Sequence, residues 1–393
     1  MDLILETVLL VVLLPMAAMT GLLFVQATAA VVKATRMKRS RTARPSIAVL
    51  VPAHDEAEGI KDTLMSIQSQ LEDGDRLLVV ADNCTDATAD VAIACGALVC
   101  VRHDTEKRAK GYALDHGIRF LSASPPQVVI VVDADCHVGE GAINILARQA
   151  SATGCPAQAL YMMLPPFGAG IMGRIAGFAW AVRNRVRPLG CHRLGLPCQL
   201  MGSGMAFPWG MISTAGLANG NLVEDIVLGI ELAERGAAPK FCPDALVTSF
   251  FPRSKEGLKS QRYRWEHGHL AVLLKTAPAV LWRGIRMRNL ALAALALDLM
   301  VPPLALFLLA LGAVWAVAAF SYFWHGAALP FAIATVLLCL MGGTLLLSWW
   351  KFGRQQLSLW DLCLGIGYLL WKIPVYLRFL LQRQVHWIKS ARH

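Results

Sequence analysis

Apolar and polar positions divide this chain into two apolar ends and a central segment of ordinary polarity. Residues 7–32 contain no charged side chain, residues 290–324 contain only Asp298, and residues 326–350 contain none. Crossing a bilayer as a helix takes about 20 apolar residues. Each of the three stretches is therefore long enough to span a membrane.

The central segment alternates short runs of β-forming residues with longer amphipathic stretches. Strands apolar on both faces are predicted over 47–51, 76–81, 98–101 and 128–132. Helices are predicted over 56–70, 85–95 and 108–121, with Thr85 or Asp86 as the cap of the second. This alternation predicts a parallel sheet covered by helices on both faces. Ligands of such sheets bind at the carboxyl ends of the strands.

Composition and charge support a membrane protein with a cytoplasmic domain. Hydrophobic residues make up 56% of the chain and charged residues 16%, which excludes a disordered protein and argues against a wholly soluble one. The net charge is +10, and six basic residues follow the first apolar stretch, at Lys33, Arg36, Lys38, Arg39, Arg41 and Arg44. The positive-inside rule then predicts an uncleaved anchor whose start lies outside.

Two other classes of site find no support in the sequence. No basic stripe interleaved with aromatic residues occurs, so no nucleic-acid partner is expected. The ten cysteines contain no CxxC pair, which argues against a zinc site or a disulfide framework.

These patterns divide the chain into five parts. The predicted parts are a transmembrane anchor at 1–32, a basic linker at 33–45, a cytoplasmic domain at 46–285, a membrane region at 286–381 and a basic tail at 382–393. The membrane region holds two spans and a last apolar stretch, 357–381, which Asp361, Lys372, Pro374 and Arg378 interrupt. We predict that this stretch is re-entrant or interfacial, with a further span as the alternative, and that it helps to form a wall for a lipid acceptor.

Acidic residues gather where the predicted strands end. The first strand ends in Pro52-Ala-His-Asp55-Glu56, the second in Asp82-Asn-Cys-Thr-Asp86 and the fourth in Asp133-Ala-Asp135. No GxGxxG follows the first strand and no Walker lysine motif occurs, so phosphates need another partner. A divalent Mg²⁺ or Mn²⁺ ion held by the Asp-x-Asp pair would serve. The alternative is that these carboxylates cap helices or lie in solvated loops.

Lys110 stands at the start of a predicted helix, where a positive charge opposes the helix dipole. A phosphate facing Lys110 would explain its place there, and a solvated lysine is the alternative.

Seven motifs in order resemble the membrane-integrated family 2 glycosyltransferases. The motifs are PAHDE, ADNCTD, AKGYAL, DAD, GSGMAF, VED and QRYRW, between about residues 46 and 270. That family has a GT-A catalytic domain and includes cellulose, chitin and hyaluronan synthases and ceramide glucosyltransferases. The resemblance implies an α/β GT-A fold with a Rossmann-like, mostly parallel sheet, combined with transmembrane helices. It also implies a nucleotide-diphosphate sugar donor, usually a UDP-sugar, and inversion at the anomeric carbon.

The resemblance also assigns expected roles to individual residues. Asp225 would be the catalytic base in the first turn of a helix predicted over 224–235, where helix capping is the alternative reading. Asp135, with Asp133, would hold the Mg²⁺ or Mn²⁺ ion. Donor-binding residues would be Pro52, Ala53, Asp55, Glu56, Asp82, Lys110, Asp133 and Ala134. Residues contacting the acceptor or the diphosphate would be Gly202, Ser203, Gly204, Glu224, Gln261, Arg264 and Trp265.

Two of the motifs depart from the family pattern, and one has a structural alternative. Asp55-Glu56 stands where the family often has Asn-Glu, and Val223 replaces a threonine. The planar guanidinium of Arg264 suits diphosphate oxygens, and the ring of Trp265 suits an acceptor sugar. The alternative for both is an interfacial aromatic and basic belt.

A basic stretch precedes the glycine segment. Its arginines are Arg174, Arg183, Arg185, Arg187 and Arg193. They are expected to contact anionic lipid headgroups or an anionic acceptor, and the alternative is that they face solvent near the membrane.

The leading hypothesis is an inverting, metal-dependent glycosyltransferase that moves a sugar from a UDP-sugar to a membrane-associated acceptor. That acceptor is a glycolipid or a lipid-linked or exopolysaccharide chain at the cytoplasmic membrane face. One alternative is a processive polysaccharide synthase that needs a homo-oligomer or a partner subunit for export. Another class is a non-catalytic sugar-nucleotide sensor or a transporter. The occupied catalytic positions argue against the sensor, and the scarcity of charge in the spans argues against the transporter.

Overall fold

A computed structural model describes residues 2–32, 43–221, 223–252, 261 and 265–381. The strands are β1 (Ile47–Ala53), β2 (Arg76–Asp82), β3 (Leu98–Arg102), β4 (Val128–Val131), β5 (His137–Val138), β6 (Ala157–Leu164), β7 (Met205–Pro208) and β8 (Lys240–Phe250). The helices of the sheet-bearing part are α2 (Ile60–Gln68), α3 (Thr88–Ala94), α4 (Lys110–Leu121), α5 (Ala142–Thr153), α8 (Trp209–Ile212) and α9 (Glu224–Glu234).

The remaining helices are long or lie beside the long ones. Those before β7 are α1 (Asp2–Val31), α6 (Ile171–Ala181), the π-helix η1 (Val182–Val186) and α7 (Arg187–Arg193). Those after β8 are the π-helix η2 (Val272–Thr276), α11 (Ala277–Arg286), α12 (Leu290–Leu299), α13 (Leu304–His325), α14 (Ala328–Ser348), the π-helix η3 (Trp349–Gly353), α15 (Leu359–Cys363) and α16 (Gly365–Leu381).

The strands form one mixed sheet in the order β3-β2-β1-β4-β7-β6-β8-β5. The pairs β1–β2, β1–β4, β2–β3 and β6–β8 are parallel, whereas β7 runs antiparallel to both of its neighbours and β5 runs antiparallel to β8. The predicted α/β fold with a mostly parallel sheet is confirmed. The antiparallel half was not predicted, because β6, β7 and β8 lack the regular strand–helix alternation.

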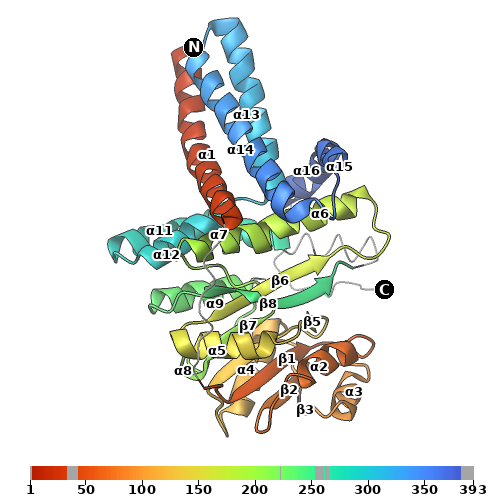
Figure 1. Ribbon diagram of the computed structural model, residues 1–393. Helices are drawn as coiled ribbons and strands as arrows, with labels where there is room; N and C mark the ends of the chain where they lie inside the picture. The colour runs from red at the N-terminus through yellow and green to blue at the C-terminus, as the bar shows by residue number, and fades with distance from the viewer. Residues whose placement is uncertain (1, 33–42, 222, 253–260, 262–264, 382–393) are drawn as a thin grey trace.

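Helices cover both faces of this sheet, as predicted (Figure 1). Apolar side chains of α2, α3 and α5 pack on one face against β1, β2 and β4. Side chains of α4, α8 and α9 pack on the other face. Burial on both faces accounts for the uninterrupted apolar runs of these three central strands.

One strand differs from the prediction of two covered faces. β3 lies at the edge of the sheet, and Leu98 is 45% and Val101 50% exposed. The prediction was wrong there because the helices leave Leu98 on one face and Val101 on the other exposed at the edge of the sheet. The helices also begin later than predicted. α2 starts at Ile60, after a turn in which Asp55 has φ 50°. α3 starts at Thr88, and Ala87 directly precedes it. Of the two predicted caps, Asp86 accepts a hydrogen bond from the Thr88 N–H at 3.0 Å, so Asp86 rather than Thr85 satisfies a backbone donor at the start of α3.

Within the described residues, three helices are long and apolar enough to cross a membrane, namely Ile4–Val31, Leu304–His325 and Ala328–Gly353. They rise together from a layer of helices that includes α6, α7, α11 and α12, and the sheet lies beyond that layer (Figure 1). Residues 290–324 were expected to form one continuous apolar span. In the structure they form α12 and α13, because Pro302 and Pro303 interrupt the helix. Asp298 therefore lies outside the long helices.

The last apolar stretch forms two helices, α15 and α16, and α16 has 17 residues. Its buried Tyr368 and Tyr376 pack with Ile175 and Phe178 of α6. That this stretch is re-entrant or interfacial remains a prediction.

The Asp298 carboxylate joins the long helices to the sheet-bearing part. It is 6% exposed. Oδ1 accepts hydrogen bonds from Gln26 Nε2 of α1 and Arg187 Nη2 of α7, both at 2.8 Å. Oδ2 accepts one from Gln199 Nε2 at 2.6 Å. Gly190 lets α7 approach α1 closely, since a Cβ at Gly190 would lie 2.1 Å from the Gln26 carbonyl oxygen. The network therefore holds α1, α7 and α12 together.

Replacing Asp298 by Asn leaves the buried Arg187 guanidinium without its counter-ion. We expect Asp298→Asn to lower the free energy of unfolding by about 3–5 kcal/mol, the range found when one partner of a buried pair is removed. The measurement is the thermal unfolding midpoint of the detergent-solubilised protein. Asp361→Asn is the control, because the Arg174–Asp361 pair is more exposed than the Arg187–Asp298 pair, and it should shift the midpoint much less. Equal shifts would contradict a special role for Asp298.

Candidate active site

Eight of the predicted site residues line one cavity of about 150 Å³. They come from α4, the segment after β4, the loop before β7, the first turn of α9 and the segment after β8, and they are Lys110, Asp133, Asp135, Gly202, Glu224, Asp225, Gln261 and Trp265. We call this the charged cavity. Residues far apart in the sequence thus meet at the carboxyl end of β4, as the rule for parallel strands predicts.

Lys110 stands at the centre of the charges. It opens α4, forms a short ion pair with Asp133, and lies 3.9 Å from Glu224 Oε1. Its Nζ also donates a hydrogen bond to the Gly202 carbonyl oxygen at 2.7 Å. Burial on its own would lower the pKa of Lys110, but Asp133 and Glu224 raise it above the ordinary value. Lys110 is therefore a permanent cation among carboxylates rather than a solvated surface lysine.

Glu224 and Asp225 occupy the first turn of α9, as the sequence predicts. Burial raises the pKa of Glu224 to about 7, against the opposing effect of Lys110. Burial also raises the pKa of Asp225, whose Oδ1 accepts a hydrogen bond from the Ile226 N–H at 2.9 Å. A carboxylate with a raised pKa is a stronger proton acceptor than a solvated one. This pair is therefore suited to acid–base chemistry, whereas simple capping would not raise the pKa of either group.

Asp133 and Asp135 follow β4 and are held by serines from other segments. The Asp133 N–H donates a hydrogen bond to Ser203 Oγ at 3.0 Å, and Ser249 Oγ donates one to Asp135 Oδ2 at 3.1 Å. Asp133, Asp135 and Cys136 each place one ligand atom within 4.8 Å of the others. Burial and the two aspartates raise the pKa of the Cys136 thiol well above its ordinary value. Because a protonated thiol is a poor ligand, this group offers carboxylate oxygens, which suit Mg²⁺ or Mn²⁺.

The glycine segment Gly202–Gly204 lies at the charged cavity, and Gly202 lines it. Gly202 has φ +89°, and a Cβ there would lie 3.5 Å from Asp225 Oδ2 and 3.8 Å from Lys110 Nζ. Gly204 has φ +67° and packs against Ala159 and Val247. Ser203 is buried and binds the Asp133 backbone. Gly202 therefore contacts Lys110 through its carbonyl oxygen, whereas Ser203 binds the Asp133 backbone and Gly204 packs against the neighbouring strands.

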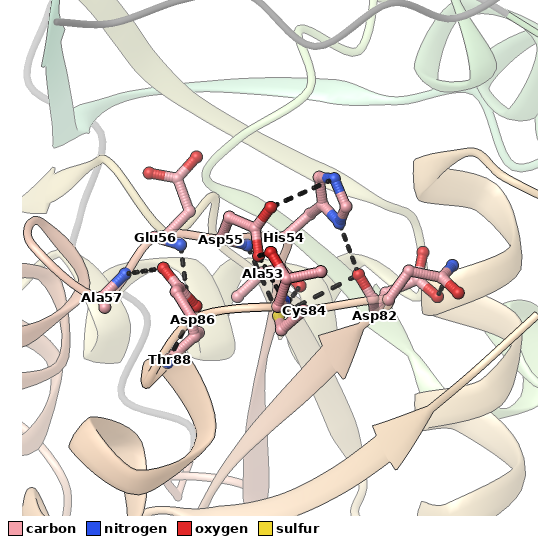
Figure 2. Close-up of polar contacts among 11 residues, drawn as sticks. Ala53, His54, Asp55, Glu56, Ala57, Asp82, Cys84, Asp86 and Thr88 are labelled. Atoms are coloured by element: carbon pink, nitrogen blue, oxygen red, sulfur yellow. Dashed lines mark hydrogen bonds and ion pairs between the residues drawn. The ribbon is translucent and has the colours of Figure 1, made fainter.

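The carboxyl ends of β1 and β2 form a separate network of hydrogen bonds (Figure 2). The His54 ring Nδ1 lies 2.7 Å from the Asp82 carbonyl oxygen, and Asp55 Oδ1 accepts a hydrogen bond from the Thr85 N–H at 2.6 Å. The Asp86 carboxylate accepts one from the Ala57 N–H at 3.0 Å. The Asp82 side chain pairs with Arg102 at 2.6 Å. These carboxylates therefore hold the turn that follows each strand.

Several predicted residues do not line the charged cavity. Those of the donor group are Pro52, Ala53, Asp55, Glu56, Asp82 and Ala134, and their role in donor binding remains a prediction. The Ala134 carbonyl oxygen accepts a hydrogen bond from Thr63 Oγ1 at 2.8 Å, which ties the Asp-x-Asp segment to α2. Arg264 lies outside the described residues.

A second cavity, of about 120 Å³, adjoins the charged one. Tyr368, Lys372 and Tyr376 of the stretch 357–381 line it, and the role of this stretch as a wall for a lipid acceptor remains a prediction. The lining of this second cavity also includes Leu23 of α1 and Val301, Pro302 and Leu304 at the start of α13. We call it the apolar cavity. The two cavities share three lining residues, Trp180, Arg183 and Trp265, and the rings of the two tryptophans lie 5.0 Å apart.

The sequence carried one signal for this shared wall. Trp180 and Arg183 are three residues apart, the spacing of neighbours on one helix face. Nothing in the sequence alone pointed to Trp265 or the start of α13 as their neighbours.

The packing of Gly204 generates a stability prediction. Gly204→Ala and Gly195→Ala both place a side chain at positive φ, which costs about 1–2 kcal/mol. A Cβ at Gly204 would also lie 2.7 Å from the Ala159 Cβ, whereas nothing lies within 4 Å of one at Gly195. Overpacking should add about 1–3 kcal/mol to the loss at Gly204. Thermal unfolding midpoints of the two variants test this difference, and equal midpoints would show that Gly204 is not needed for close packing.

Comparisons with known proteins agree with this geometry. The probable glycosyltransferase YdaM of Bacillus subtilis (strain 168) is 25% identical over 258 residues, which are 59% of this chain and 57% of that protein. The chain thus matches little more than half the length of that relative. The mannosyltransferase PcManGT from Pyrobaculum calidifontis, solved with GDP-Man and Mn²⁺, is similar in fold with a TM-score of 0.52. That match has 18% identity and covers 87% of this chain and 99% of that one.

The family assignment rests on a longer match within this chain. The description of the matching family is glycosyltransferase-like family 2, and the match extends over residues 45–268. These residues contain β1 to β8 and the described residues of the charged cavity other than Asp298. The chain therefore belongs to glycosyltransferase family 2, and its sheet-bearing part has the GT-A fold.

Proposed function

We propose that this enzyme transfers a sugar, with inversion, from a nucleotide-diphosphate sugar to an acceptor carried by a membrane lipid. The observation that carries the proposal is the shared wall of the two cavities. The charged cavity is lined by the expected base Asp225, the Asp-x-Asp pair and Lys110, and the apolar cavity is lined in part by residues of α1 and of the start of α13. A lipid acceptor needs both environments, one for its tail and one for its reacting hydroxyl.

The metal-binding part of the proposal rests on Asp133 and Asp135. Lys110 already pairs with Asp133, so Asp135 is the better metal ligand of the two. The hydrogen bond from Ser249 orients the Asp135 carboxylate, as outer-shell partners of metal ligands do. A bound Mg²⁺ or Mn²⁺ ion would stabilise the negative charge of the diphosphate leaving group. Lys110, a cation at the same place, would contact the donor phosphates.

Asp225 is the proposed catalytic base. Its carboxylate would take the proton of the acceptor hydroxyl while that oxygen attacks the anomeric carbon. The bond from the anomeric carbon to the donor diphosphate breaks in the same step, and the nucleoside diphosphate leaves with the bonding electron pair. Attack from the face opposite the leaving group inverts the anomeric centre. Glu224 would assist at the acceptor side, and Trp265 would offer its ring to the acceptor sugar.

The donor is proposed to be a UDP-sugar, by resemblance to the family. The mannosyltransferase of similar fold was solved with GDP-Man, so GDP-sugars belong in the same assay. The proposed location is the cell membrane with the catalytic domain in the cytoplasm, supported by three apolar helices and the basic residues after the first. Three such helices favour a lipid acceptor over a secreted polymer, whose channel would require further helices from a partner subunit or a homo-oligomer.

Asp225→Asn tests the proposed base. We expect transfer to fall by about 100- to 10,000-fold, the usual contribution of a general base, while binding of the nucleotide with Mn²⁺ is unchanged. Membranes carrying each variant are incubated with labelled UDP- and GDP-sugars, and the label is partitioned between organic solvent and water. Glu231→Gln, on the same helix and paired with Arg235, is the matched control and should retain activity. Undiminished transfer by Asp225→Asn would overturn the role of the base, and water-soluble product of high mass would identify a polymer synthase.

Ser249→Ala tests the metal site without removing a ligand. Losing the hydrogen bond to Asp135 should weaken Mn²⁺ binding by about 10- to 100-fold, measured by paramagnetic resonance titration in the presence of UDP. Asp135→Asn should weaken it at least as much.

The control for the metal site lies in a second group of possible ligands. Asp55, Cys84 and Asp86 also place ligand atoms within 4.8 Å of one another. Their carboxylates bind backbone N–H groups of neighbouring turns, so Asp86→Asn should leave Mn²⁺ affinity unchanged. Weaker binding in Asp86→Asn alone would move the metal to that group.

A further inference from the structure

Three of the five arginines in the basic stretch bind a carboxylate or carbonyl oxygens of another helix. Arg174 pairs with Asp361 at 3.1 Å, and Arg187 pairs with Asp298 at 2.8 Å. Arg193 donates hydrogen bonds to carbonyl oxygens at the end of α1, including that of Ala29 at 3.0 Å. These three residues join α6 and α7 to α15, α12 and α1.

Arg183 and Arg185 form no hydrogen bond or ion pair with another described residue. The Arg183 guanidinium lies 5.9 Å from the centroid of the Trp180 ring, and that of Arg185 lies 5.1 Å from the centroid of the Phe352 ring. Arg183 lines both cavities, whereas Arg185 lines neither. Arg183 is half-buried and lies on the π-helix η1, and single π-helical turns are frequent at functional sites. Because no described carboxylate contacts it directly, its guanidinium can bind an anionic ligand.

The other charges of the apolar cavity balance one another. Lys372 forms a short ion pair with Glu266, and the counter-ion of Arg187 is Asp298. Burial lowers the pKa of His269 to about 3, so that ring is neutral. Its Nε2 lies 3.0 Å from the Val301 carbonyl oxygen and donates to it. Among the described lining residues, one positive charge is left over, that of Arg183.

The neighbouring charges place Arg183 on the acceptor side rather than the donor side. The charged groups that act most strongly on its guanidinium are Arg187, Asp225, Glu266 and Asp298. For Lys110 the corresponding groups are Asp133, Glu224 and Asp225. Asp225, the proposed base, acts on both cations. Lys110 pairs with Asp133 of the Asp-x-Asp segment. Arg183 lines the charged cavity together with Asp225 and also lines the apolar cavity.

We infer that Arg183 binds the anionic phosphate of the acceptor lipid. The tail would occupy the apolar cavity, the phosphate would lie against Arg183 in the shared wall, and a hydroxyl of the same headgroup would reach Asp225. The inference rests on the proposed function and adds the chemical class of the acceptor, a phosphate-bearing lipid. Arg183 would thereby select anionic over neutral lipids and position the headgroup.

Lipid binding by the full-length protein tests this inference without knowledge of the natural acceptor. The probes are dioleoylphosphatidylglycerol and dioleoylglycerol, which share tails and differ in the phosphate, and the readout is native mass spectrometry in detergent. Charged hydrogen bonds of this kind contribute about 1.5–3 kcal/mol, so Arg183→Gln should lose at least about tenfold in affinity for the anionic lipid. Binding of the neutral lipid should not change.

Arg185→Gln is the matched control, because it removes the same charge two residues away. It should bind both lipids as the parent protein does. Binding of UDP or GDP with Mn²⁺, measured by calorimetry, should be unchanged in Arg183→Gln. Three results would overturn the inference: unchanged lipid binding in Arg183→Gln, an equal loss in Arg185→Gln, or a loss of nucleotide binding in place of lipid binding.

The transfer assay separates this inference from the proposed function. Asp225-dependent label in a neutral lipid would leave the proposed function standing and refute the phosphate site. Absence of Asp225-dependent label with every donor would count against the proposed function, while the lipid-binding comparison would still decide the role of Arg183.

Discussion

A buried carboxylate determines how the catalytic domain meets the long apolar helices. An ionised carboxylate removed from water needs charged or hydrogen-bonding partners, and Asp298 finds them in Gln26, Arg187 and Gln199. These side chains come from α1, α7 and the loop before β7, so one group sets the relative positions of three segments. Asp298 and Gln199 also line the charged cavity, and Arg187 lines the apolar one. The adjacency of the two cavities depends on this network.

The charged cavity has more carboxylates than cations, and this imbalance suits its proposed chemistry. Lys110 compensates part of the negative charge of Asp133 and Glu224. Burial raises the pKa values of Glu224 and Asp225. A divalent cation would supply the missing positive charge, and a donor diphosphate would in turn need it. On the far side of the base, Arg183 supplies a single positive charge to a largely apolar cavity. The two ends of the site are thus matched to ligands of different character.

Much of the catalytic half was predictable because its signals are local. Continuous apolar runs predicted β1, β2 and β4, and the acidic residues that follow them marked the ligand edge of the sheet. The first turn of α9 was predicted at Glu224 and Asp225, where the structure has it. The antiparallel half was not predictable, because β5 has two residues and pairs only with β8, more than a hundred residues later. The break between α12 and α13 was not predicted, because the high hydrophobicity of residues 290–324 was given more weight than Pro302 and Pro303.

The alternation of strands and helices can be read from the amino-acid sequence alone, and so can the three long apolar stretches and the family motifs. Backbone sterics and local hydrophobic periodicity set these features, and both act over a few residues. Only the tertiary structure decided which arginine meets which carboxylate. Arg187 and Asp298 are 111 residues apart, and the five arginines of the basic stretch are alike in the sequence. Their different roles follow from burial and from neighbours brought close by packing, which a local pattern does not contain.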